Sequence, residues 1–142
     1  MILVRRSAYI PRNLLALLGI YCLASLIHFA HNAEYLAAYP NLPAWLTRAG
    51  VYISWLVVTA VGMIGVLCLR FGLRALGLLF IASYAALGFA GLDHYTVAAM
   101  SAHTLAMNAT IWFEVAAASM LLVVTLGLLL RAFRAAQTPG TG

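Results

Sequence analysis

The sequence predicts an all-α integral membrane protein, an up-and-down bundle of four transmembrane helices with both termini cytoplasmic. Hydrophobic residues make up 65% of the chain and charged residues only 8%, with a mean hydropathy of +1.02, which is typical of polytopic membrane proteins. Four apolar segments are long enough to cross a hydrocarbon core of ~30 Å. Seven of the eight arginines flank the same ends of these segments, as the positive-inside rule requires of cytoplasmic ends.

The first predicted helix covers residues 13–35 and follows Arg5, Arg6 and Arg12. A basic start before an apolar run is also the pattern of a secretory signal peptide. No small-x-small cleavage pattern follows the run, and cleavage would leave only three helices. We therefore expect this segment to remain as the first transmembrane helix.

The second and third predicted helices cover residues 50–69 and 75–92. The turn between them, which carries Arg70 and Arg74, is so short that the two helices must be antiparallel neighbours. Pro40 and Pro43 prevent helix formation in the loop before the second helix.

The fourth predicted helix covers residues 104–130 and is followed by Arg131 and Arg134. Residues 1–136 are then a single domain, and 137–142 a flexible tail. The arginines place the termini on the cytoplasmic side of a bacterial inner membrane or its equivalent, and the bilayer is the expected partner. The basic pI of about 9.7 follows from the same arginines, so we expect no binding of nucleic acid.

Histidines and carboxylates gather near the opposite, outer ends of the helices. Counted from the arginine-marked ends, His28 lies ~22 Å up its helix and Glu114 ~24 Å up the fourth, with Asp93 and His94 at ~28–30 Å. A charge at this depth is disfavoured unless it faces protein, water or a partner. We therefore predict a His/carboxylate site near the outer, periplasmic membrane face.

Imidazoles and carboxylates from facing helices are how helical bundles build metal sites. His103 shares a helix face with Glu114 and joins the site only if the preceding loop folds back. Such nitrogen and oxygen ligands, without a nearby thiolate, suit iron, copper, zinc or manganese. A b-type haem is a weaker variant, because it does not use the carboxylates. The predicted ligands are His28, His31, Asp93, His94, His103 and Glu114.

Such a site favours a metal-binding protein. One such protein would be an oxidoreductase that acts on a hydrophobic small molecule. Glu114 is the predicted proton acceptor. The sequence alone does not decide whether the protein is an enzyme. The residues predicted to line a substrate cavity are Tyr35, Tyr52, Trp55 and Asn108.

Two other classes of function compete. A protonatable cluster also suits a proton-binding or ligand-binding transport-related protein, although the apolar cytoplasmic half offers no polar path. A short chain without a soluble domain also suits an accessory subunit of a larger membrane complex, or a homo-oligomer, in which polar residues serve helix association. Outside the site, Glu34 is expected to pair with Arg48, and Cys22 and Cys68 to form no disulfide.

Overall fold

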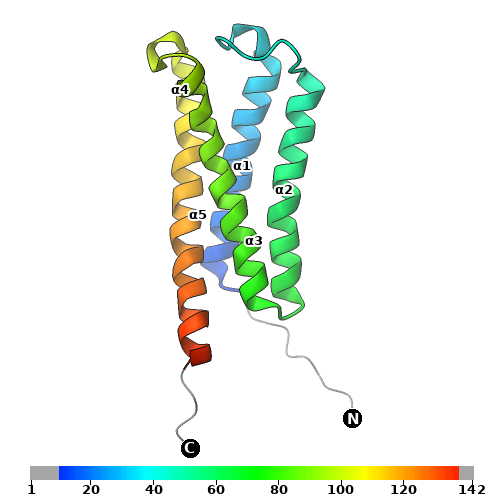
Figure 1. The fold of residues 1–142 in the computed structure, drawn as a ribbon, viewed down its shortest axis with the longest axis vertical. Coiled ribbons are helices and arrows are strands. Elements are labelled where there is room, and N and C mark those ends of the chain that lie inside the picture. The colour runs from blue at the N-terminus through cyan, green and yellow to red at the C-terminus, as the bar shows by residue number, and fades with distance from the viewer. Residues whose placement is uncertain (1–9, 138–142) are drawn as a thin grey trace, which may run out of the picture.

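The computed structural model describes residues 10–137, which are helical apart from short turns and loops and contain no strand (Figure 1). Four helical segments are long and apolar enough to cross a membrane: Arg12–Glu34, Arg48–Arg70, Arg74–Val97 and Leu105–Ala135. This confirms the predicted all-helical fold and its four long segments. The elements are α1 (Arg12–Glu34), η1 (Leu36–Ala38), α2 (Arg48–Arg70), α3 (Arg74–Leu87), η2 (Gly88–Asp93), α4 (His94–Val97), η3 (Met100–Ala102) and α5 (Leu105–Gln137).

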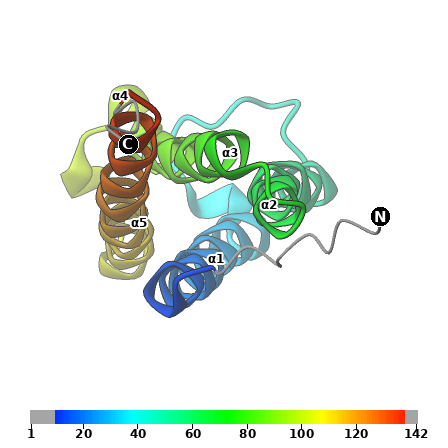
Figure 2. The same ribbon diagram turned by 90° about the horizontal axis from the view of Figure 1, so that it is seen from below.

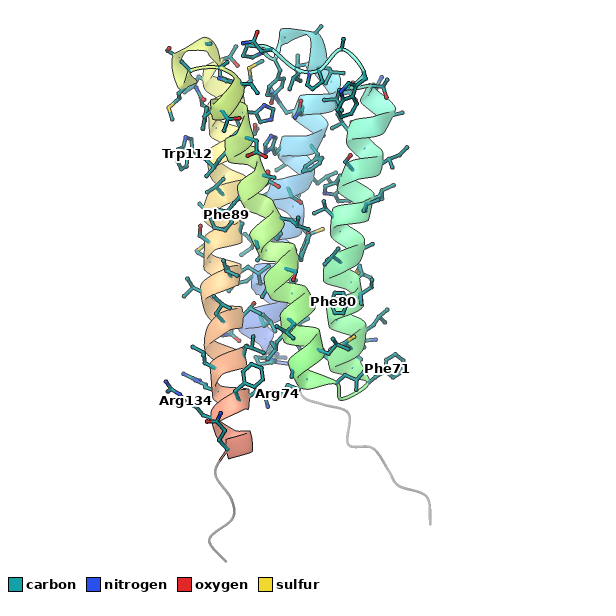
Figure 3. All side chains as sticks on the ribbon, in the orientation of Figure 1. Phe71, Arg74, Phe80, Phe89, Trp112 and Arg134 are labelled. Atoms are coloured by element: carbon teal, nitrogen blue, oxygen red, sulfur yellow. The ribbon has the colours of Figure 1, made fainter. Side chains whose placement is uncertain are left out.

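The long helices form a ring in which α1 packs against α2 and α5, and α3 packs against the same two helices. Figure 2 shows this ring end-on. The chain runs up and down, so α1 begins and α5 ends at the same end of the bundle (Figure 1). Arg74 and Arg134 lie at that end, as Figure 3 shows.

The inner half, next to that arginine-bearing end, has an apolar core. Leu14, Ile81 and Leu121 are fully buried there. Helices α2 and α3 come very close, because a Cβ added to Gly65 would lie 2.7 Å from Ile81 Cγ1 and 3.0 Å from the Gly77 carbonyl oxygen. Small residues at such a crossing allow backbones to approach.

Two predicted helix boundaries differ from the structure. The third helix is α-helical only to Leu87 and continues as the 3₁₀ segment η2, where Gly88 and Gly91 pass close to neighbouring helices. The fourth helix extends to Gln137 rather than residue 130, since alanine, arginine and phenylalanine can all continue a helix. Gln137, predicted to begin the flexible tail, therefore belongs to α5, and 138–142 lie outside the described residues.

Candidate functional site

A histidine and a glutamate meet inside the outer half of the bundle. His28 of α1 and Glu114 of α5 are each only 2% exposed, and His28 Nδ1 lies 2.5 Å from Glu114 Oε2. Gly91 leaves room for them, because a Cβ there would come within 3.1 Å of His28 Cε1 and 3.3 Å of Glu114 Oε2. The close passage of η2 and the packing of α1 on α5 therefore create this pair.

The other face of His28 continues the hydrogen-bonded chain. His28 Nε2 lies 3.4 Å from His94 Nε2, and Asn32 Nδ2 donates to the same His94 nitrogen at 3.1 Å. With the amide oriented in this way, His94 Nε2 accepts, so the bond from His28 must be donated by His28 Nε2. If Nδ1 also donates to Glu114, His28 is an imidazolium and Glu114 a carboxylate.

A cavity of about 130 Å³ adjoins this chain. Its polar wall consists of His28, Asn32, His94 and Glu114, and its apolar wall includes Phe29. The side-chain oxygen of Asn32 is buried and has no hydrogen-bond partner among the described residues. Asn32, which lines the cavity, therefore has a side-chain acceptor without a partner among the described residues.

A second hollow, of about 190 Å³, lies on the outer side of His94, which it shares with the first. Leu42 and Pro43 of the loop between η1 and α2 line it together with Asp93. The loop is fastened across the bundle, since Asn41 Nδ2 donates to the Val97 carbonyl oxygen at 2.8 Å. This loop thus forms the outer wall of the site region.

Tyr39, at the end of η1, covers His94 from above. It is 4% exposed, its ring centroid lies 4.9 Å from that of His94, and its hydroxyl shares a 2.9 Å hydrogen bond with His31 Nδ1. Burial raises the pKa of Tyr39 to about 12, so the hydroxyl stays protonated. His31 is therefore held by the covering loop.

His103 lies on the far side of His94, with ring centroids 6.0 Å apart. The loop before α5 does fold back, as the predicted role of His103 required, and leaves this residue 6% exposed. His103 Nδ1 lies 3.0 Å from the Ala99 carbonyl oxygen, so that nitrogen carries the proton. Its Nε2 is buried and unpartnered among the described residues.

The predicted metal ligands thus separate into two groups. His28, His94 and Glu114 come together, with His103 next to His94. His31 bonds to the loop, and Asp93 lines the outer hollow. Across residues 10–137, no group of three or more His, Cys, Asp or Glu side chains is arranged to hold a metal ion.

None of the four residues predicted to line a substrate cavity touches the cavity beside Glu114. Tyr35 directly follows α1 and is 58% exposed. Tyr52 donates to Glu34 at 2.8 Å and Trp55 to Ser25 at 3.1 Å, while Asn108 accepts from Tyr95 at 2.8 Å. The last three side chains therefore tie neighbouring segments together.

Sequence reasoning omitted Asn32, Tyr39 and Gly91 from the site. Asn32 had a usable signal, since it follows His28 by one helical turn and therefore lies on the same helix face. Gly91 also had a usable signal, since it follows Gly88 by about one helical turn, and small residues on one helix face allow neighbouring helices to approach. Tyr39 had no signal, because its position depends on how an irregular loop folds back.

Comparison with known proteins assigns no family to this arrangement. No protein-family model, no curated protein and no solved structure matches the chain.

Proposed function

We propose that the chain is an integral membrane protein of the bacterial inner membrane or its equivalent, with both termini cytoplasmic. The arginines at one end of the bundle support this orientation. The outward surface of the long helices is apolar, with Leu56 59%, Val57 63% and Val123 70% exposed. Such surfaces suit lipid, and the Glu114 site then lies in the outer half of the bilayer.

We further propose that the site in this outer half holds a proton and also binds a small ligand. We call it the proton-holding site. The observation that carries the proposal is the 2.5 Å contact between His28 Nδ1 and Glu114 Oε2, two groups removed from water. A buried acid and base in contact share a proton, and intramembrane ionisable groups commonly serve proton or ligand binding. His94 extends the path for that proton toward the outer hollow.

The cavity restricts the ligand to a small molecule with a hydrogen-bond donor. The side-chain oxygen of Asn32, which has no partner among the described residues, can only accept a hydrogen bond, so it favours a ligand that donates one. A volume of about 130 Å³ is slightly below that of a cavity able to hold benzene, which is roughly 150 Å³. A ligand that bonds to His28 or Glu114 changes where the proton resides, so binding and protonation are coupled.

A metal ion is a second candidate occupant, as one observation favours it. Two nitrogens bound about 2.0–2.1 Å from a tetrahedral ion lie roughly 3.3–3.4 Å apart, and the Nε2 atoms of His28 and His94 are 3.4 Å apart. Glu114 would then act as the carboxylate that orients a liganding histidine. His103, whose ring centroid lies 6.0 Å from that of His94 and whose Nε2 is buried without a partner among the described residues, would supply a third nitrogen only after its side chain moved closer.

Histidine ¹⁵N spectra of labelled, metal-free protein test the proton-holding site, because the chain has only four histidines to assign. We expect His28 to show the signals of an imidazolium in the native protein and those of a neutral ring in Glu114→Gln. His31, one turn away and bonded to Tyr39, is the matched control and should not change. A neutral His28 that Glu114→Gln leaves unaltered would contradict the proposal.

Metal analysis of protein purified without a histidine tag or chelator decides between the two candidates. Stoichiometric metal that is lost in both His28→Ala and His94→Ala, and kept in His31→Ala, would show that the site binds a metal ion and is not the proton-holding site. Metal-free protein that keeps its helix content and its imidazolium signal supports the proton-holding site.

A further inference from the structure

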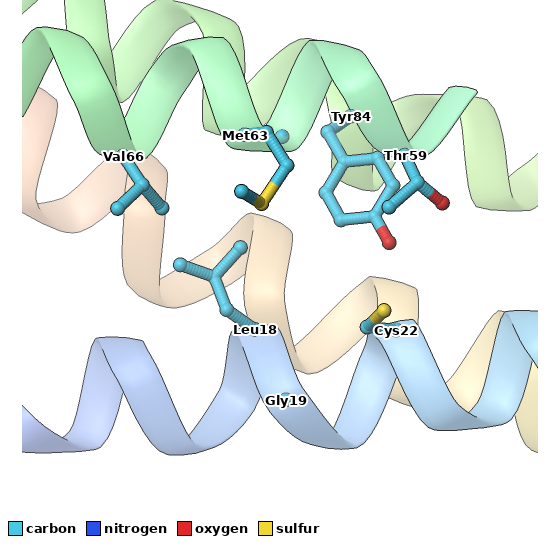
Figure 4. A pocket seen from close by; sticks show the side chains of 8 residues that line it. Leu18, Gly19, Cys22, Thr59, Met63, Val66 and Tyr84 are labelled. Carbon is cyan, nitrogen blue, oxygen red and sulfur yellow. The ribbon is translucent and has the colours of Figure 1, made fainter. Parts of the chain in front are cut away.

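A crevice on the side of the bundle lies away from the Glu114 site, where α1, α2 and α3 meet (Figure 4). Its volume is about 190 Å³. The walls are apolar side chains, among them Leu18 and Val66, and Met63 at the rim is 59% exposed. Thr59 is eleven residues from the arginine that ends α2, or ~16 Å along that helix, so the crevice opens near the middle of a ~30 Å membrane core.

Two hydroxyl groups in this crevice have no hydrogen-bond partner among the described residues. Tyr84, from α3, is 2% exposed, and both its hydroxyl and that of Thr59 are buried without a hydrogen bond of normal geometry. The Tyr84 hydroxyl lies near the side chains of Thr59, Ser25 and Cys22. Figure 4 shows the Tyr84 hydroxyl directed across the gap toward the side of Cys22. A buried hydroxyl without a partner is costly, particularly where no water is at hand.

We propose that this crevice binds a ring-sized, lipid-soluble molecule carrying a hydroxyl or carbonyl oxygen. The volume exceeds that of a cavity of roughly 150 Å³ that accepts benzene. The apolar walls suit the body of such a molecule, and the hydroxyls of Tyr84 and Thr59 suit its oxygen. The exposed rim at Met63 lets it enter from the bilayer. The inference uses the proposed membrane placement but none of the residues of the outer site.

The test compares phenol with benzene, two rings that differ by one hydroxyl. The protein carries ¹³C-methyl methionine and is held in phosphatidylcholine nanodiscs, where Met63 reports on the crevice. Met120, 50% exposed on α5, is the matched control for probe dissolved in the bilayer. We expect phenol to shift Met63 and to bind about tenfold more tightly than benzene, at equal mole fraction in the bilayer.

Two kinds of variant sharpen this test. Tyr84→Phe and Thr59→Val remove hydroxyls with little change in volume and should reduce the preference for phenol while benzene still binds. Gly19→Leu should exclude both probes, because Gly19 lines the crevice and a Cβ there meets nothing within 4 Å. Gly127→Leu is its control, since Gly127 on α5 has equally open surroundings and lies outside the crevice.

Several outcomes would overturn the proposal. Equal binding of phenol and benzene in the native protein would make the crevice a groove for acyl chains. Unchanged preference in Tyr84→Phe and Thr59→Val would show that the hydroxyls do not recognise the oxygen. A Met63 shift that survives Gly19→Leu, or no shift at all, would place the probes elsewhere. Unchanged Met107 and Met120 signals show that each variant is folded.

Discussion

The outer and inner halves of this bundle bury their side chains equally well but hold them by different means. Glu114 is 2% exposed and Leu121, two turns along the same helix, is fully buried. Glu114 depends on a 2.5 Å contact with one specific atom of His28. Leu121 and its neighbours in the inner half depend on shape, as do the closely packed glycines of α2 and α3.

The two halves should therefore fail in opposite ways. A buried polar network is damaged by losing a partner, because the group left behind has no water to replace it. A close-packed apolar crossing is damaged by gaining volume. Both halves lie along the same long helices, so the contrast reflects which residues the sequence places at each level.

The largest effect is expected at Glu114. Glu114→Ala leaves the His28 Nδ1 group buried without its partner, and we expect a loss of ~3–5 kcal/mol in the free energy of unfolding. Glu114→Gln keeps a hydrogen-bonding side chain of the same shape and should lose ~1–3 kcal/mol. Unfolding in detergent, followed by circular dichroism, measures both. A Glu114→Gln variant as stable as the native protein would show that the pair contributes through shape, as in the inner half.

An intermediate effect is expected where the inner half gains volume. Gly65→Ala places a Cβ 2.7 Å from Ile81 Cγ1 and 3.0 Å from the Gly77 carbonyl oxygen, so the helices must separate. We expect a loss of ~1–3 kcal/mol from overpacking, despite the higher helix propensity of alanine. Gly127→Ala, with nothing within 4 Å of the new Cβ, should instead gain up to ~1 kcal/mol. If both variants gain stability, shape does not govern the inner half.

This division also explains how much of the molecule the sequence predicts. The four long helices follow from hydropathy and length, and the α2–α3 turn from the short spacing between Arg70 and Arg74. The change to a 3₁₀ helix at Gly88 was missed, because it depends on how closely Tyr21 and Ala118 pack against that glycine. The pattern of apolar residues in the sequence does not indicate how closely neighbouring helices pack at a given residue.

The sequence predicts the depth of the site along the helices but not the contacts between its residues. Counting along the helices placed His28, His94 and Glu114 at similar depth, and the structure brings these three together. Depth alone could not separate His28 from His31, which bonds to Tyr39 instead. The loop that carries Tyr39 has no periodicity, so nothing in the sequence shows which side chains it covers.

The smallest effect is expected at the other glutamate that meets a basic partner. Glu34 Oε1 lies 2.6 Å from Arg48 Nη2, a pair predicted from the sequence and confirmed by the structure. The side chains are 41% and 68% exposed, so water and salt screen their attraction. Glu34→Gln should therefore lose no more than ~1 kcal/mol, and high salt should remove most of that loss. Because the Glu34 and Glu114 contacts are almost equally short, the Gln variants of the two differ chiefly in burial. A loss at Glu34 as large as that at Glu114 would mean that contact distance, rather than removal from water, sets the strength of these pairs.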